Sequence, residues 1–224
     1  MLTLAIETST PLASVALGDE SGMVAESTLP MRITHSESVV PDIGRLFGES
    51  GFSPDDLASV VVGAGPGSFT GVRVAAAIAK GICFARGLPL FAYSDLLAAA
   101  VGTDVGTNIC ALFDARREEV YAAAYGVTDP PQARIEPCAR VIDDVLAELA
   151  PVSDWTFAGD GAVRFASVIL ERGGTVLPAD AGVPRAATLL WLRREHPALG
   201  RIEDVADWEP SYVRASGAER ALEA

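Results

Sequence analysis

The chain has 224 residues, half of which are apolar, and a formal net charge of −13. This length suffices for one large domain or two small lobes, and the apolar share is large enough for a substantial core. The negative charge repels phosphate backbones, which argues against a protein that binds nucleic acid over its whole surface.

Export, a disulfide framework and a membrane span are not predicted. Residues 1–16 alternate polar and apolar side chains without a basic start, and no apolar run approaches the ~18 residues of a membrane span. The three cysteines, Cys83, Cys110 and Cys138, are odd in number, widely spaced and outside any CxxC pair. We therefore expect a protein of the reducing cytoplasm with no membrane association.

The chain begins with a predicted β-hairpin. Leu2–Ile6 is an apolar run that ends at Glu7, Thr8–Pro11 is a polar turn, and Ala13–Gly18 alternates like a half-buried strand. After the hairpin we expect a strand at Met23–Thr28, a helix over His35–Phe47, a buried strand at Leu57–Val62, a helix over Val72–Ala85, a strand at Leu90–Tyr93 and a helix from Ser94 to about Val101.

The same order of features returns after a linker-like segment, Gly102–Thr107. An apolar run ends at Asp114, a polar turn covers Ala115–Glu119, and Val120–Tyr125 is a second strand. This repetition predicts two lobes built on a shared hairpin, with domains at residues 1–102 and 103–224. Beyond it we expect a proline-rich loop at Asp129–Pro137, a helix near Asp143–Leu149, strands at Trp155–Ala158 and Thr175–Leu177, and helices over Val163–Glu171 and from Pro184 to about His196, which makes the class α/β.

Gly65–Gly71 is a glycine-rich loop between a predicted buried strand and a helix. Backbone N–H groups and the helix dipole could hold an anion there. The loop matches neither G-x-G-x-x-G nor a P-loop, however, and its glycines could equally let the backbone pass close to a neighbouring segment while Ser68 or Thr70 caps the helix.

The helix that follows is rich in small residues and apolar on more than one side. Ala75, Ala79 and Gly81 would permit close approach of another helix, while Val74 and Ile78 add apolar area. Such a helix is either deeply buried or partly covered by a partner.

Catalytic groups are hard to assemble from this sequence. His35 and His196 are the only histidines, and neither belongs to an H-x-x-x-H pair, so no catalytic metal site is predicted. In actin-like ATPases two hairpin turns grip phosphates through glycine-containing loops, but neither Thr8–Pro11 nor Ala115–Glu119 contains glycine.

Several segments, in order along almost the whole chain, resemble the TsaB (YeaZ) family. They are Leu4–Thr10 with Ala13–Leu17, His35-Ser36-Glu37 with Pro41 and Ile43, Gly65–Arg73 continuing to Ala79-Lys80-Gly81, Asp114–Tyr121, Gly159-Asp160-Gly161 and Glu209–Arg214.

The resemblance implies an actin-like ATPase (ASKHA, ribonuclease H-like) fold of two lobes with a reduced second lobe. It implies a heterodimer with TsaD, a catalytic paralogue that works with the ATPase TsaE to place a threonylcarbamoyl group on the adenosine at tRNA position 37. TsaD carries an H-x-x-x-H metal pair, and by resemblance the two corresponding places here fall at Asp95 and Ala99, of which Ala99 cannot bind a metal. The chain is therefore expected to be a non-catalytic scaffold without cofactors of its own, with ATP and metal on its partners and tRNA bound only indirectly.

Two sets of residues follow as site hypotheses. The partner surface, which could also pair two copies of the chain, is predicted to comprise His35, Glu37, Val40, Ile43, Phe47, Arg73, Val74, Ala75, Ile78, Ala79 and Ile82. A vestigial nucleotide cleft is predicted at Glu7, Ser9, Asp114, Arg116 and Glu118. The alternative functions are an ATP-dependent enzyme of the sugar-kinase type, which would need phosphate loops with glycine, and a metallopeptidase, which would need the missing ligands.

Overall fold

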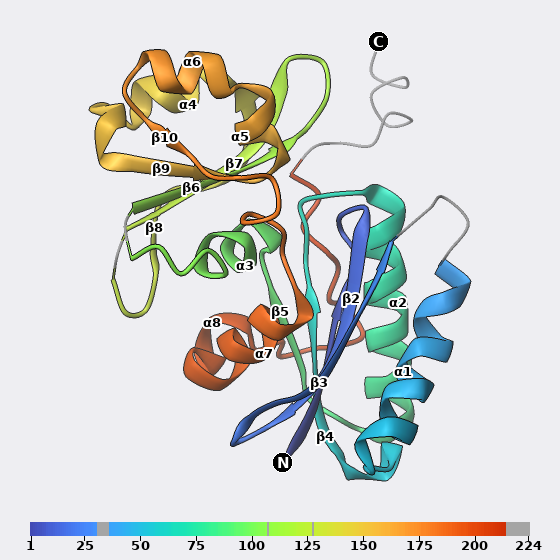
Figure 1. Ribbon diagram of the computed structural model, residues 1–224. Coiled ribbons are helices and arrows are strands. Elements are labelled where there is room, and N and C mark those ends of the chain that lie inside the picture. The colour runs from blue at the N-terminus through green and yellow to red at the C-terminus, as the bar shows by residue number, and fades with distance from the viewer. Residues whose placement is uncertain (31–35, 107, 127, 214–224) are drawn as a thin grey trace. The chain divides into compact units, whose positions relative to one another are not determined.

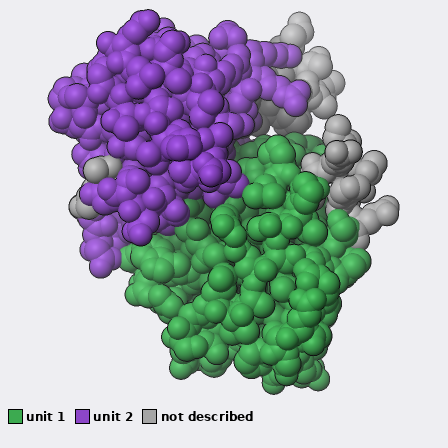
Figure 2. Space-filling view, viewed as in Figure 1, with its two compact units in different colours: residues 1–98, 184–211 green, residues 99–183, 212–224 purple. Residues whose placement is uncertain are grey.

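The computed structural model describes residues 1–30, 36–106, 108–126 and 128–213. The chain forms two compact units (Figures 1 and 2): unit 1 consists of residues 1–98 and 184–211, and unit 2 of residues 99–183 with the described residues after 211. The sequence placed the division after residue 102 and gave all of 103–224 to the second lobe. Residues 184–211 belong instead to unit 1, because the helix Ala186–Glu195 packs against its sheet.

Unit 1 is built on a five-stranded mixed sheet of order β3-β2-β1-β4-β5. The first three strands form an antiparallel meander, and β4 and β5 run parallel to β1. The strands are β1 (Leu2–Glu7), β2 (Leu12–Asp19), β3 (Gly22–Pro30), β4 (Leu57–Gly63) and β5 (Leu90–Tyr93).

Helices cover both faces of this sheet. α1 (Ser36–Ser50) and α2 (Phe69–Arg86) lie side by side on one face, and α7 (Ala186–Glu195) lies on the other (Figure 1). All six residues of β1 are buried, as expected for a strand covered from both sides. Its even-numbered side chains join the core under α1 and α2, whose members include Leu4, Ile6, Val15, Leu46 and Ala79.

Three shorter helical segments complete unit 1 near the strand ends: η1 (Pro54–Asp56), α3, which begins in this unit and spans Asp95–Val101, and α8 (Pro197–Gly200). The segment after α8 returns to α2, where the ammonium group of Lys80 donates hydrogen bonds to the carbonyl oxygens of Ala206 and Trp208, each at 2.8 Å. Trp208 packs against the core of the same unit.

Unit 2 repeats the plan of unit 1 with shorter helices. Its sheet has the order β10-β9-β6-β7-β8, in which β6, β7 and β8 are antiparallel neighbours and β9 and β10 continue in parallel from β6. The elements are β6 (Asn108–Asp114), β7 (Glu119–Gly126), β8 (Gln132–Val141), α4 (Ile142–Glu148), η2 (Val152–Asp154), β9 (Trp155–Ala158), α5 (Asp160–Arg164), α6 (Ala166–Glu171) and β10 (Thr175–Val176).

The equal strand order of the two sheets confirms the predicted fold class, an α/β, actin-like fold of two lobes. In each lobe the first strand begins an antiparallel meander of three strands on one side and is followed by two parallel strands on the other. In unit 2 the core gathers on the helix-covered side and includes Leu112, Ile135, Leu146 and Phe157.

One local prediction was wrong. Asp129–Pro137 was expected to be a loop, but β8 begins at Gln132. Proline is tolerated because β8 is an edge strand, and its pairing with β7 shifts between Ile135 and Cys138, so the ladder skips Pro137 at a bulge. The strand was not predicted because it contains a proline and shows no regular alternation of polar and apolar residues.

Among the described helices none is long and apolar enough to cross a membrane. Cys83, Cys110 and Cys138 are free, and burial raises the pKa of the Cys83 thiol to about 11. Cys83 belongs to the core of unit 1.

Candidate functional site

The glycine-rich loop between β4 and α2 packs directly on the turn that follows β1. The Ser68 N–H donates to the Ser9 carbonyl at 2.7 Å, and the Thr8 hydroxyl donates to the Gly71 carbonyl at 2.6 Å. A Cβ at Gly67 would lie 2.6 Å from the Ser9 carbonyl oxygen, and one at Gly71 would overlap the Thr8 carbonyl. Of the two interpretations of this loop, the structure supports close backbone packing, with Ser68 as the N-cap of α2.

Two fully buried carboxyl groups meet beside the same loop. Glu7 ends β1, Asp95 begins α3, and both residues are 0% exposed. Glu7 Oε1 accepts hydrogen bonds from the Ser9 N–H at 2.6 Å and the Ser9 hydroxyl at 2.7 Å, and Asp95 Oδ2 accepts one from the Gly65 N–H at 2.7 Å. A Cβ at Gly63 would overlap both remaining oxygens, Glu7 Oε2 and Asp95 Oδ1, so these two oxygens face the same spot.

Burial dominates the electrostatics of this pair. It raises the pKa of Glu7, and it raises the pKa of Asp95 well above the ordinary value, with a further increase from the negative charge of Glu7. Sequence reasoning placed Glu7 and Ser9 in a nucleotide cleft; the structure bonds them to each other and closes Glu7 off from solvent. Asp95, which the resemblance places at one of the two positions of the TsaD metal pair, was not included in that cleft; it lies two residues after β5, a strand parallel to β1, and faces Glu7.

The other predicted cleft residues lie in the β6–β7 turn of unit 2. The carboxylates of Asp114 and Glu118 both pair with Arg164 from α5, a residue that the sequence analysis did not single out. Arg116 contributes its backbone N–H, which donates to Asp114 Oδ1 at 2.7 Å. The backbone of residues 116–118 is left-handed, with φ of 62°, 51° and 63°, although none is glycine. The structure thus joins Asp114 and Glu118 through an arginine of their own unit.

Some residues of the predicted partner surface are buried in the core of unit 1 and others are exposed. Ala75 and Ala79 are 1% and 0% exposed, and Ile43 and Phe47 also belong to the buried core, so these four cannot reach a partner without unfolding. The reason is that their positions lie on the sheet-facing sides of α1 and α2. Val74, Ile78 and Ile82 are half-buried against the same core, whereas Val40 and Arg73 are exposed; His35 lies outside the described residues, and the Glu37 side chain is not described.

A set of exposed residues on these two helices overlaps the predicted surface only at Val40 and Arg73. Val40 is 58% exposed, Phe84 71% and Phe69 45%, and a Cβ added at Gly44, Gly48 or Gly81 would meet nothing within 4 Å. We call this set the α1/α2 face; it consists of Val40, Gly44 and Gly48 on α1 and of Phe69, Arg73, Ala77, Gly81 and Phe84 on α2. Its spacing of three or four residues was readable in the sequence, but the side of the helix that faces solvent was not.

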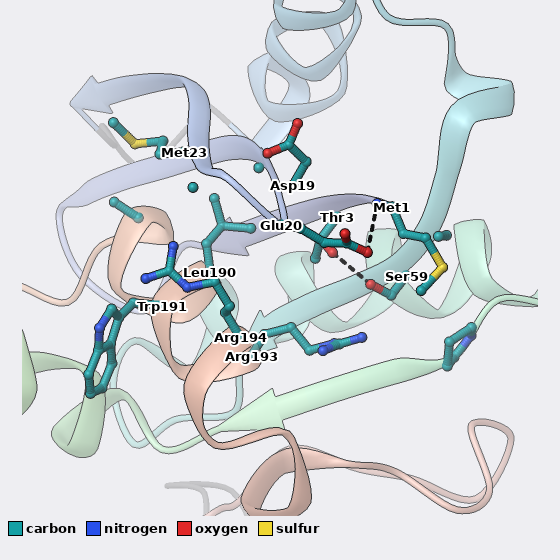
Figure 3. A pocket seen from close by; sticks show the side chains of 15 residues that line it. Met1, Thr3, Asp19, Glu20, Met23, Ser59, Leu190, Trp191, Arg193 and Arg194 are labelled. Atoms are coloured by element: carbon teal, nitrogen blue, oxygen red, sulfur yellow. Dashed lines mark hydrogen bonds and ion pairs between the residues drawn. The ribbon is translucent and has the colours of Figure 1, made fainter.

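A pocket of about 540 Å³ opens at the opposite end of the unit 1 sheet, where β1 and β4 begin (Figure 3). On its floor Thr3 Oγ1 and Ser59 Oγ form a buried hydrogen bond of 2.8 Å. The Arg193 guanidinium lies 4.0 Å above the centre of the Phe91 ring. Carboxylates of the β2–β3 turn and guanidiniums of α7 share the lining, so charges of both signs meet there. The sequence analysis assigned no residue of this pocket to a functional site.

No group of three or more His, Cys, Asp or Glu side chains with the geometry of a metal site occurs within residues 1–30, 36–106, 108–126 and 128–213. The carboxyl pair of Glu7 and Asp95 therefore stands as two acids without a third ligand.

Comparison with known proteins gives relatives over the full length. The "tRNA threonylcarbamoyladenosine biosynthesis protein TsaB" of Bacillus subtilis is 31% identical over 98% of this chain and 96% of its own, and that of Escherichia coli is 29% identical over 99% and 98%. The chain belongs to the TsaB family. The solved structure of "YeaZ from Pseudomonas aeruginosa" superposes with a TM-score of 0.78 at 27% identity, covering 94% of this chain and 99% of that one.

A family model described as "TsaD: tRNA N6-adenosine threonylcarbamoyltransferase" also matches residues 27–170. TsaB-family chains and that transferase thus share a common sequence pattern across both units. The sequence motifs that pointed to the TsaB family, and the two-lobe actin-like fold inferred from them, are confirmed by these relatives and by the strand order.

Proposed function

We propose that this chain is a non-catalytic subunit of the machinery for tRNA threonylcarbamoyladenosine synthesis, in which it binds and stabilises a TsaD-like catalytic paralogue. Its full-length relatives are named as biosynthesis proteins of that modification, and the transferase model itself matches residues 27–170. Two proteins built on one pattern can associate through equivalent helices, much as identical subunits do.

The observation that carries the proposal is the α1/α2 face. Phe84, Val40 and Phe69 present large apolar side chains to solvent on two adjacent helices, and burying the part of each that is still exposed would contribute about 1–2 kcal/mol. The exposed glycines would let a partner helix approach closely. Arg73, whose guanidinium lies 3.7 Å above the centre of the Phe69 ring, would form part of a polar rim.

Three features of the described residues support a subunit without catalysis of its own. Glu7 is closed off from solvent, the acids of the β6–β7 turn are paired with Arg164, and no cluster of three metal ligands is present. ATP and metal would then reside on a TsaD-like subunit and a TsaE-like ATPase in the cytoplasm. The tRNA would contact this chain only indirectly, because the net charge of −13 repels its phosphates. Without the partner, two copies could pair through the same face.

The test is co-purification with the TsaD-like paralogue of the same organism. Phe84→Glu should abolish the complex and leave the melting temperature unchanged, because the side chain is 71% exposed in the free chain. Leu170→Glu is a matched control, since Leu170 is a large apolar residue of α6, 57% exposed and outside the α1/α2 face. A folded Phe84→Glu variant that binds the paralogue as strongly as the wild type would refute the proposed surface.

A further inference from the structure

Glu7 and Asp95 each keep one carboxyl oxygen that no N–H or O–H group of the described residues satisfies. Glu7 Oε1 takes both hydrogen bonds from Ser9, and Asp95 Oδ2 takes the one from Gly65. Glu7 Oε2 and Asp95 Oδ1 are buried and have no donor of this kind. Two ionised oxygens left without partners in a dry interior would carry a heavy desolvation penalty.

We infer that Glu7 and Asp95 hold one proton between them, in a carboxyl–carboxylate hydrogen bond that joins Glu7 Oε2 to Asp95 Oδ1. The two oxygens face the same spot beside Gly63, where each lies 2.1 Å from the place that a Cβ would take. One proton satisfies both oxygens at once. The single negative charge that remains is stabilised by the three donors from Ser9 and Gly65.

A proton fits this place better than a cation does. The charged or titratable groups that act on the pair are only the two carboxyls themselves, and Ser9 and Gly65 add neutral donors. No lysine, arginine or histidine contributes there in the described structure. A metal ion would need further ligands, and the described residues hold no group of three around the pair.

The shared proton ties three elements together: the end of β1 through Glu7, the start of α3 through Asp95, and the first residues of the glycine-rich loop through Gly65. Burial raises the pKa of both groups, whereas both carboxyls of an unfolded chain titrate near pH 4. Above that pH the folded chain therefore holds one proton more than the unfolded chain. The stability that the proton confers is complete below about pH 4 and declines as the pH rises towards and through the raised pKa, tenfold in the folding equilibrium constant for each pH unit.

The experiment is urea unfolding of the full chain at several pH values between about 5 and 8. Glu7→Gln and Asp95→Asn each replace the shared proton by an amide N–H that donates to the opposite carboxylate. Both variants should lose the tenfold change per pH unit that the wild type shows. Glu20→Gln is the control for a lost negative charge, because the Glu20 side chain is 80% exposed, and it should keep the wild-type pH dependence.

Infrared spectroscopy of the folded chain gives a second readout, which does not depend on unfolding. The C=O stretch of a protonated carboxyl should be present at neutral pH, absent from Glu7→Gln and Asp95→Asn, and retained in Glu20→Gln. The proposal is overturned if the wild type lacks this band at neutral pH, or if the wild type and a folded Glu7→Gln or Asp95→Asn variant share one pH dependence of unfolding.

Discussion

Two alanines of α2, Ala75 and Ala77, are two positions apart, and the same substitution should lower the stability of the chain strongly at Ala75 and very little at Ala77. Ala75 is 1% exposed and packs in the core of unit 1, whereas Ala77 lies on the α1/α2 face. Glutamate is a good helix former, so its intrinsic helix propensity costs either site only a few tenths of a kcal/mol. Any larger difference between Ala75→Glu and Ala77→Glu must therefore come from burial.

The cost at Ala75 follows from the position of the side chain. A carboxyl placed in that core without a cation would be neutral, and keeping a carboxyl with an ordinary pKa near 4.3 protonated at pH 7 costs about 4 kcal/mol. The extra volume adds about 1–3 kcal/mol in a well-packed interior. A total of at least about 5 kcal/mol is comparable with the whole stability of many domains. Ala77→Glu should cost less than about 1 kcal/mol.

Thermal and urea unfolding followed by circular dichroism measure both variants. For a chain of this size the melting temperature of Ala75→Glu should fall by about 10 °C or more, and that of Ala77→Glu should change by no more than about 2–4 °C. The penalty at Ala75 should also shrink as the pH falls towards 4.3, since neutralising the introduced carboxyl then costs less. An Ala75→Glu variant as stable as the wild type would refute the assignment of this side of α2 to the core. So would an Ala77→Glu variant that is equally destabilised.

Two further expectations concern the loop and turns at the end of β1. Gly71→Ala should destabilise the chain by about 2–4 kcal/mol in urea unfolding, because its Cβ would overlap the Thr8 carbonyl and disturb the hydrogen bond from the Thr8 hydroxyl. Gly81→Ala is the control, because a Cβ there meets open space, and it should be neutral or slightly stabilising in the same assay. Calorimetric titration of the free chain with ATP and magnesium should show weak or no binding, since Glu7 is buried and Arg164 already pairs with Asp114; sub-micromolar affinity would revive the sugar-kinase alternative.

Much of the fold was readable from the sequence because its signals are local. The apolar run Leu2–Ile6, the turn after Glu7 and the repeat of this order at Asp114 predicted the hairpins on which both sheets are built. The strand β8 escaped prediction because its proline is accommodated by an edge position and a bulge. Both of these properties depend on neighbouring strands and cannot be seen within the segment itself.

The candidate sites were less predictable for a related reason. A helical spacing shows which residues share one side of α2, but small residues such as Ala75 and Ala77 suit a core and an interface equally well. Only the packing of α2 on β4 and β1 decides which side turns inward. The pairing of Glu7 with Asp95 depends on the order of parallel strands, which brings β1, β4 and β5 side by side from distant parts of the chain.

The two lobes repeat one topology, but the first hairpin turn makes different contacts in each lobe. In unit 1 the turn after β1 is covered by the backbone of the glycine-rich loop, and the acid at the strand end is buried against Asp95. In unit 2 the acid at the end of β6 stays near the surface and is paired with Arg164. Glycine in the turns themselves, which would allow a phosphate to approach the backbone, is absent from both. The hairpin of unit 1 thus contributes Leu4, Ile6 and Val15 to the core under α2, and the partner surface that we propose lies on the α1/α2 face.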